Sequence, residues 1–392
     1  MSNSGEVVGV RDRWVGVGHE VQVGPLAGQQ AAISALGGRE PSVVVVFASP
    51  VHDLGAVGAA VRDAAGTAVP IVGCTTAGEI TEAQVGSGGV VVLALGGDGF
   101  AVSTAVGNLA DGAHAAGAAA AAGITGIHSR HRVLMMLSDG LAGDRLAMLR
   151  GAYSVTGAAV PLVGGCAGDD FAMQETRQLF GDRVLTQAVV GVAIGSQAPI
   201  GVGIGHGFHR TGEPMVVTAS TTDRVLRLDD EPALDVYLTR MNADPSAYED
   251  LSILREIASR HALGLQRVGG EELRAVLGAD YGERSLTAAD IPEGSMLWVM
   301  EGDADSVRDG AGVACEEALR LLEGRDPIGM VAFDCLGRRM ILGEEGIREE
   351  IALITSCAPG VPLAGFYTYG EIGRVRGSRG IHSATLVLLA LA

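Results

Sequence analysis

The chain has 392 residues, which is long enough for two or three domains that each bury a hydrophobic core. Its formal net charge is -18 and all of its 28 basic residues are arginines, so neither nucleic acid nor an anionic membrane is expected as its main partner. Five cysteines without a CxxC pair indicate a reducing compartment, and residues 1–10 lack the apolar run of a signal peptide, so we expect a cytoplasmic protein.

The first half of the chain alternates strand and helix patterns. Strand runs that are apolar on both faces, such as 42–48 and 132–138, are typical of buried parallel or mixed sheets. Asp53 or Ser49 is expected to cap the helix that follows the first of these runs, and Asp144 the helix that follows the second. The predicted elements are, in order, strand 13–18, helix 29–36, strand 42–48, helix 54–65, a hairpin of strands 89–95 and 100–106, helix 113–122, strand 132–138, helix 144–153 and strands 187–194, 199–205, 214–218 and 224–228.

From about residue 231 the strand signals thin out and helical patterns replace them up to residue 290. The alternation of strand and helix patterns then resumes, and it includes an amphipathic helix that we expect to end at Gly324. The predicted elements of this half are helices 233–241, 251–261, 271–277 and 306–323, strand 328–334 and a closing strand 383–392.

Three stretches that begin with Val-Pro are nearly copies of one another. Residues 69–80 and 361–372 share the register VPxxGxxxxGEI, whereas the copy at 160–170 is one residue shorter between its glycines and ends in Asp169-Asp170. Each copy follows a buried strand and a helix, so the sequence predicts an α/β fold of duplicated strand-helix-strand units that form mixed sheets with flanking helices. We expect the glycine loops to gather at the strand ends, where ligands bind in such sheets.

The third unit carries the most varied chemistry. An arginine there could hold a carboxylate, a glutamate could hold an amino group, and tyrosines could cover an apolar body. We therefore predict a ligand pocket built on loops of this unit, from Cys335, Arg338, Gly365, Tyr367, Tyr369, Gly370 and Glu371. The alternative is that Cys335 is a buried small side chain and that Arg338 pairs on the surface with Glu344 or Glu345. Secondary candidates in the other two glycine loops are Cys74, Gly78, Glu79, Cys166, Gly168 and Asp169.

Other chemistries find less support in the sequence. A phosphate loop needs lysine after its second glycine, but glutamate stands there in the first and third copies. His206 and His209 would face opposite sides of a strand, and no further ligand stands at suitable spacing, so no metal site is predicted. Helix dipoles could lower the thiol pKa values of Cys74 and Cys166, but no histidine stands beside them as a base.

These motifs resemble the FIST family of sensory domains. VPIVGCTTAGEI, VPLVGGCAGDD, GEPMVVT and LDDEPALDVY carry the resemblance to the N-terminal FIST domain, expected at 1–237 with its core at 42–237. AFDCLGRR and VPLAGFYTYGEIG carry that to the C-terminal FIST domain, expected at 238–392 with its core at 296–392. The resemblance implies a bacterial, non-catalytic sensor that binds a small ligand, with amino acids as proposed ligands.

Because the chain shows no output segment, the resemblance implies that it signals through a separate protein such as a histidine kinase. Two alternatives stay open. The first is a haem-binding nitric-oxide sensor that regulates a histidine kinase, although we expect no cofactor and a colourless protein, since His206 and His209 are poorly placed as ligands. The second is an enzyme with Cys335 as its nucleophile.

Overall fold

A computed structural model describes residues 12–24, 26–267, 270–374 and 380–392. The expectation about a signal peptide at residues 1–10 lies outside this described part. No helix of the described part is both long and apolar enough to cross a membrane.

The body of the molecule consists of three α/β units that repeat one order of elements. Each unit runs strand, helix, strand, helix, strand, two-stranded hairpin, strand. The first unit contains β1 (Trp14–Glu20), α1 (Ala27–Leu36), β2 (Pro41–Ala48), α2 (Leu54–Ala65), β3 (Ile71–Thr75), β4 (Glu79–Thr81), β5 (Val85–Gly86) and β6 (Val90–Gly96). The second contains β7 (Phe100–Asn108), α3 (Ala113–Ala121), β8 (His131–Ser138), α4 (Arg145–Thr156), β9 (Leu162–Cys166), β10 (Gln178–Phe180), β11 (Arg183–Leu185) and β12 (Ala188–Ser196), with 3-10 turns at Leu109–Asp111 and Ala122–Gly126.

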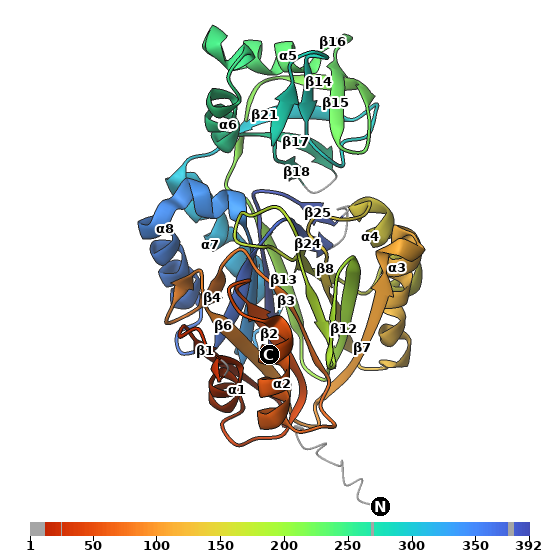
Figure 1. The fold of residues 1–392 in the computed structure, drawn as a ribbon, viewed down its shortest axis with the longest axis vertical. Helices are drawn as coiled ribbons and strands as arrows, with labels where there is room; N and C mark the ends of the chain where they lie inside the picture. The colour runs from red at the N-terminus through yellow and green to blue at the C-terminus, as the bar shows by residue number, and fades with distance from the viewer. Residues whose placement is uncertain (1–11, 25, 268–269, 375–379) are drawn as a thin grey trace, which may run out of the picture.

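The third unit is interrupted by an inserted domain, which lies at the top of Figure 1. The unit contains β13 (Ile200–Gly205), α7 (Ala304–Arg320), β22 (Gly329–Cys335), α8 (Leu336–Cys357), β23 (Leu363–Thr368), β24 (Glu371–Arg374), β25 (Ile381–His382) and β26 (Leu386–Leu391). The inserted domain contains β14 (His209–Ser220), β15 (Arg224–Leu228), β16 (Glu231–Pro232), α5 (Ala233–Arg240), a 3-10 turn at Pro245–Tyr248, α6 (Leu251–Arg260), β17 (His261–Arg267), β18 (Gly270–Arg274), β19 (Gly278–Asp280), β20 (Ser285–Thr287) and β21 (Met296–Glu301).

The three units exchange their hairpins in a cycle. The hairpin of the first unit joins the sheet of the third through β4 and β23, the hairpin of the second joins the first through β10 and β3, and that of the third joins the second through β24 and β9. The resulting mixed sheets are β1-β6-β2-β3-β10-β11, β25-β24-β9-β8-β12-β7 and β13-β26-β22-β23-β4-β5. The predicted fold class is therefore confirmed, and no unit is complete without a hairpin from another.

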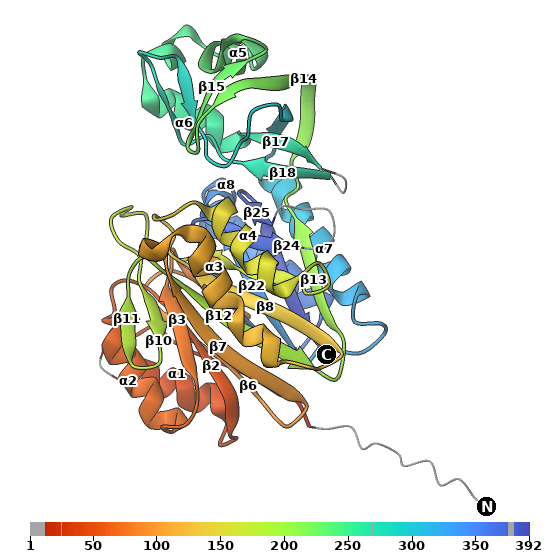
Figure 2. The ribbon, with the colours of Figure 1, turned by 90° about the vertical axis from the view of Figure 1, so that its right-hand side faces the viewer.

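The inner faces of the three sheets share one hydrophobic core. Phe366 lies at its middle, with its ring centroid 4.8 Å from that of Phe47 and 5.8 Å from that of Phe333. Two helices per unit cover each outer face, as Figures 1 and 2 show. Glycine lets these helices approach closely: a Cβ on Gly203 would lie 1.8 Å from the carbonyl oxygen of Ala314 in α7. This packing explains the glycine-rich sequence of β13.

The inserted domain has its own apolar core and enters and leaves through neighbouring strands, because His209 of β14 pairs with Glu301 of β21. Its presence affects the domain division. β13 lies before residue 237 but pairs with β26 at the end of the chain. The expected division of the chain into two FIST domains at residues 237/238 stays a prediction.

Two predicted elements are wrong. Strands β6 and β7 form no hairpin, because β6 lies in the sheet of the first unit and β7 in that of the second. The segment 271–277 starts as strand β18 and not as a helix. Pairing of β18 with β17 overrides the helix propensity of its Glu-Glu-Leu-Arg sequence. The predicted caps Asp53 and Asp144 are confirmed, since each side chain accepts hydrogen bonds from N–H groups of its helix.

Candidate functional site

The three glycine loops meet at one end of the body. We call residues 75–79, 166–170 and 367–371 together the glycine-loop ring. Backbone hydrogen bonds join each loop to the next: Ala77 N–H to Tyr367 O, Tyr367 N–H to Gly78 O, Gly168 N–H to Thr75 O, Cys166 N–H to Gly370 O and Tyr369 N–H to Cys166 O. The prediction that these loops gather at strand ends is confirmed.

The acids of the first and third loops are buried in equivalent ways. Glu79 accepts hydrogen bonds from the Thr76 hydroxyl and, at 2.8 Å, from the Gly89 N–H. Glu371 accepts them from the Thr368 hydroxyl at 2.7 Å and the Thr385 N–H at 3.2 Å. Burial raises the pKa of each carboxyl group to about 8. Both side chains are therefore mostly protonated at neutral pH.

The corresponding position in the second unit is Gln178. It pairs with Cys74 in the sheet as Glu79 pairs with Phe366 and Glu371 with Gly165. Its Oε1 accepts the Ala188 N–H at 3.3 Å, ten residues later, as Glu79 accepts that of Gly89.

Asp169 and Asp170, the acids that end the second copy in the sequence, therefore do not occupy the position that corresponds to Glu79. The second unit has extra residues between Gly168 and β10, so its equivalent of Glu79 lies further along the chain, at residue 178. Asp169 instead accepts the N–H groups of Met173, Gln174 and Glu175 and orders that insertion. The ten-residue interval from residue 178 to the next strand was the signal in the sequence that could have revealed Gln178.

Gln178→Glu should therefore create a third buried acid with a raised pKa. We expect little change in the free energy of unfolding at pH 5 and a growing loss up to pH 9, because the carboxylate must lose its charge to fold. Urea unfolding at both pH values measures the effect, with the exposed Gln187→Glu as the matched control. A loss that does not depend on pH would contradict the equivalence.

Arg338, which we expected to hold a ligand carboxylate, has no exposed surface. Its Nε donates to Asp334 Oδ1 at 2.7 Å, its Nη1 to the His206 carbonyl oxygen at 3.1 Å and its Nη2 to Glu350. A surface pair with Glu344 or Glu345 is wrong too, because it is Arg339 that lies 3.9 Å from Glu344. Each residue of a helix turns about 100° from the last, so α8 points residue 338 inward and residue 339 outward.

The other residues predicted in the third unit are buried beside this cluster. Tyr367 and Glu371 have no exposed surface, which contradicts their expected place on surface loops. Gly365 lies within β23, where a Cβ would be 2.2 Å from the Ala332 carbonyl oxygen, so its absence of a side chain serves packing. The Tyr367 hydroxyl, Asp334 Oδ2 and Glu350 Oε2 have no hydrogen-bond partner within the described residues.

The thiols of the candidate site are not activated. Burial raises the pKa values of Cys74 and Cys335 well above the ordinary range and that of Cys166 to about 12. The expected lowering of the Cys74 and Cys166 pKa values by helix dipoles is therefore wrong. Cys335 Sγ accepts the Gly337 N–H at 3.4 Å and caps α8. This hydrogen bond gives Cys335 a structural role as the N-cap of α8.

The surroundings of the two histidines do not fit haem. His206 Nδ1 accepts the Phe208 N–H at 3.0 Å, and a Cβ on Gly207 between them would lie 1.9 Å from the Ser306 carbonyl oxygen, so the segment packs directly on α7. Burial lowers the pKa of His206 to about 4. His209 is exposed and lies 3.8 Å from Glu301. Neither histidine lines any of the cavities described here.

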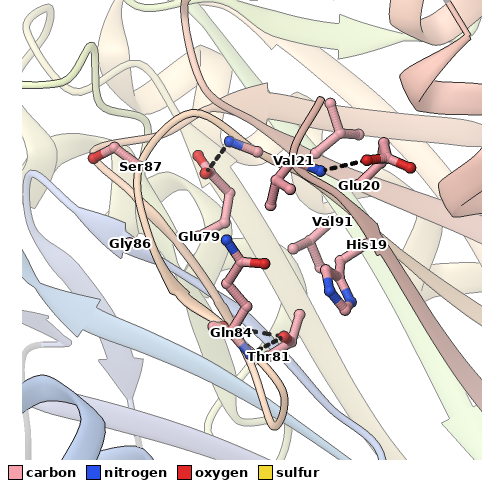
Figure 3. Close-up of a pocket in the computed structure, with 11 residues that line it drawn as sticks. His19, Glu20, Val21, Glu79, Thr81, Gln84, Gly86, Ser87 and Val91 are labelled. Atoms are coloured by element: carbon pink, nitrogen blue, oxygen red, sulfur yellow. Dashed lines mark hydrogen bonds between the residues drawn. The ribbon is translucent and has the colours of Figure 1, made fainter. Parts of the chain in front are cut away.

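A small hollow lies beside Glu79, and Figure 3 shows it between β1, the β4–β5 hairpin and β6. Its volume of about 10 Å³ suits one water molecule. The hollow is lined by His19, Glu20, Val21, Glu79, Thr81, Gln84, Gly86, Ser87, Gly89, Val90 and Val91.

A larger cavity of about 470 Å³ separates α4 from the inserted domain. We call it the interdomain cavity. Its lining comes from the first turns of α4 and two loops of the inserted domain: Asp144, Leu146, Arg150, Ser220, Thr221, Thr222, Asp290, Ile291, Pro292 and Glu293.

Arg145 connects this cavity with the glycine-loop ring. One guanidinium nitrogen lies 3.2 Å from Asp290 Oδ2 in the inserted domain, and another donates to the Tyr369 carbonyl oxygen at 3.4 Å. The Tyr369 hydroxyl donates to Asp169 and accepts the Phe171 N–H at 3.0 Å. Among the predicted ligand residues of the third unit, Tyr369 accepts a hydrogen bond from Arg145 and Gly370 adjoins it.

Comparisons with known proteins agree with the two-part organisation. The profile of the FIST N domain matches residues 42–231 and that of the FIST C domain residues 233–374. An uncharacterised protein of Mycobacterium tuberculosis is 29% identical over 230 residues, which cover 57% of this chain and 59% of that protein. One of Mycobacterium bovis is 30% identical over 236 residues, which cover 57% of this chain and 58% of that protein.

A third relative, an uncharacterised protein of Methanocaldococcus jannaschii, is 28% identical over 155 residues and covers 37% of this chain and 30% of its own length. The chain therefore spans less than two thirds of the relatives that it matches. Among solved structures, PurLQS from Thermotoga maritima aligns with 97% of this chain and 72% of that chain at 9% identity and a TM-score of 0.21, which is too low to support an argument.

Proposed function

The chain belongs to the FIST family, whose domains are generally signal-sensing domains, and we propose that it is a cytoplasmic sensor of a small zwitterionic metabolite, such as an amino acid. The observation that carries the proposal is the interdomain cavity, because a ligand in it would contact both α4 and the inserted domain. Its volume of about 470 Å³ falls within the usual range for small-molecule sites.

The lining of the cavity suits a zwitterion. Arg150 is exposed and has no hydrogen bond or ion pair within the described residues, so it is available for a carboxylate. Asp290 and Glu293 lie across the cavity and would attract an amino group. The hydroxyl groups of Thr221 and Thr222 add hydrogen-bonding capacity.

Signalling would start at Arg145. A ligand amino group near Asp290 competes with Arg145 for the same carboxylate and so changes the contact of Arg145 with Tyr369 and Gly370 in the ring. The changed conformation of the glycine-loop ring would then be recognised by a separate signalling protein, such as a histidine kinase. Ligand contacts by the remaining predicted residues stay a prediction. In this proposal Cys74, Cys335, Arg338 and Gly365 support the ring from neighbouring strands and helices, and the ring itself contains Gly78, Glu79, Cys166, Gly168, Asp169, Tyr367 and Glu371 as backbone or buried positions.

A thermal-shift screen of amino acids and related zwitterions tests the proposal. A ligand at 100 times its dissociation constant adds about 2.7 kcal/mol of stability. We expect Arg150→Ala to weaken binding of the identified ligand at least tenfold without lowering the melting temperature of the free protein, since Arg150 is exposed and unpaired. Arg130→Ala, also exposed on the second unit, is the matched control. Binding unchanged by Arg150→Ala would place the ligand elsewhere.

A further inference from the structure

The internal repeat allows the same place to be compared three times within one molecule. Residues 87, 186 and 383 follow the donated hairpins at equivalent positions, and the next residue has a positive φ in each unit: 94° at Gly88, 50° at Gln187 and 50° at Ala384. Beside each hairpin, the end of the first strand of the unit pairs with the start of its last strand. In the first and second units these strand ends line a groove.

In the third unit this groove is filled by the chain itself. Strand β18 of the inserted domain lies along the edge strand β25. The Ser383 N–H donates to the Leu273 carbonyl oxygen at 3.2 Å, and Arg274 donates to the Ile381 carbonyl oxygen at 2.8 Å. Leu273 is fully buried and belongs to the same hydrophobic cluster as Ala384 and Leu386. An extended segment with one apolar side chain thus occupies this groove.

In the first unit the groove is closed. Its remnant is the hollow of about 10 Å³ beside Glu79, and Arg339 of α8 donates to the Ser87 hydroxyl at 2.9 Å.

In the second unit the groove is open, with a volume of about 390 Å³. It lies between α3 and the hairpin β10–β11, which stands at the left edge of the body in Figure 2. Its lining is Val106, Gly107, Asn108, Asp111, Ala115, Ala116, Ala119, Arg183, Leu185, Thr186 and Ala188. We call it the β11 groove.

The groups along the β11 groove are free to bind. β11 is the last strand of its sheet, so its outer edge pairs with no other strand in the described part of the chain. The side chain of Arg183 and the N–H of Thr186 have no hydrogen-bond or ionic partner among the described residues, and both residues are exposed. Asp111 lines the groove opposite and is also unpaired there.

We propose that the β11 groove docks an extended segment of a partner protein in the way that β25 docks β18. The Thr186 N–H would donate to a carbonyl oxygen of the segment, as Ser383 does to Leu273. An apolar side chain would enter between Val106 and Ala119, an acidic side chain would pair with Arg183, and a basic one with Asp111. The partner sequence therefore carries an acid, an apolar residue and a base in succession, like Glu272-Leu273-Arg274.

The test uses the full-length protein and a fluorescein-labelled peptide with the sequence of residues 270–276, GEELRAV. Fluorescence anisotropy should show saturable binding to the wild-type protein. We expect Arg183→Glu, which reverses the charge, and Ala119→Trp, which fills the groove from an exposed position, each to weaken binding at least tenfold. The matched controls Arg130→Glu and Ala59→Trp change exposed residues outside the groove and should bind as the wild type does.

Three results would overturn the proposal. The first is the lack of saturable binding to the wild-type protein. The second is equal binding by Arg183→Glu and Ala119→Trp, which would place the peptide elsewhere, for instance at the β25 edge after displacing β18. The third is complete displacement of the peptide by N-acetyl-leucine at the same concentration, which would make the groove a small-molecule site instead of a docking surface.

Discussion

Between pH 6.5 and 8 the free energy of unfolding should fall by about 3 kcal/mol more in the wild-type protein than in the double variant Glu79→Gln/Glu371→Gln. Both carboxyl groups have a pKa of about 8 in the folded protein because they are buried. In the unfolded chain a glutamate has a pKa of about 4.3. The folded state therefore binds more protons than the unfolded state throughout this interval.

The sign follows from proton linkage. A raised folded-state pKa gives stability that is fully present below about pH 4.3 and is lost as the pH rises to about 8. Each group contributes a loss of about 1.4 kcal/mol per pH unit well below pH 8 and about half of that at pH 8, so two groups between pH 6.5 and 8 give about 3 kcal/mol. His206 and His382 act in the opposite direction, because burial lowers their pKa values and their stability is lost on acidification below about 6.5. Starting at pH 6.5 separates the two effects.

Glutamine is the appropriate replacement because Gln178 already occupies the equivalent position of the second unit. Its amide oxygen can accept the backbone N–H, as Gln178 Oε1 does from Ala188, and the side chain carries no titratable proton. Urea unfolding at pH 6.5, 7.25 and 8 gives the slopes, with the exposed Glu82→Gln as the matched control. Parallel slopes for the wild-type protein and the double variant would show that Glu79 and Glu371 ionise normally in the folded protein.

The sequence predicted the repeated units but not how they assemble. Val-Pro strands and apolar runs are local signals, and they correctly located β2, β3, β8, β9, β22 and β23. The cyclic exchange of hairpins depends on pairing between segments such as β4 and β23, whose residues Gly365 and Ile80 are hundreds of positions apart. A three-residue strand gives no periodic signal from which such a partner could be predicted.

The side chains that line the candidate site could not be predicted for a similar reason. Whether Arg338 or Arg339 faces the core depends on where α8 begins, and a shift of one residue moves a side chain by about 100° around the helix. Contacts of the inserted domain, such as Arg145 with Asp290, join segments whose sequences carry no common pattern. The loops of the site could therefore be predicted from the sequence, but the interdomain cavity could not.

Arg338→Ala should lower the free energy of unfolding by about 3–5 kcal/mol, the usual cost of removing one partner from a buried ion pair. The guanidinium group holds Asp334 and Glu350, all three side chains are almost completely buried, and its removal leaves two buried carboxyl groups facing each other. Urea unfolding measures the loss. Arg348→Ala in the same helix is the matched control, because the Arg348 side chain is 66% exposed and pairs with Glu344 at 3.7 Å, so its loss should cost about 1 kcal/mol or less.

A second variant separates the loss of charge balance from the loss of packing. Arg338→Met/Glu350→Met removes one charge of each sign and fills the space with flexible apolar side chains, while Asp334 Oδ1 keeps the Cys335 N–H at 2.8 Å. We expect it to recover at least half of the stability that Arg338→Ala loses. If Arg338→Ala instead unfolds like the wild-type protein but no longer responds to the ligand found in the screen, Arg338 is a ligand anchor and must leave its carboxylate partners on binding. If both arginine variants lose the same free energy of unfolding, the buried ion pairs of Arg338 stabilise the protein no more than an exposed ion pair does.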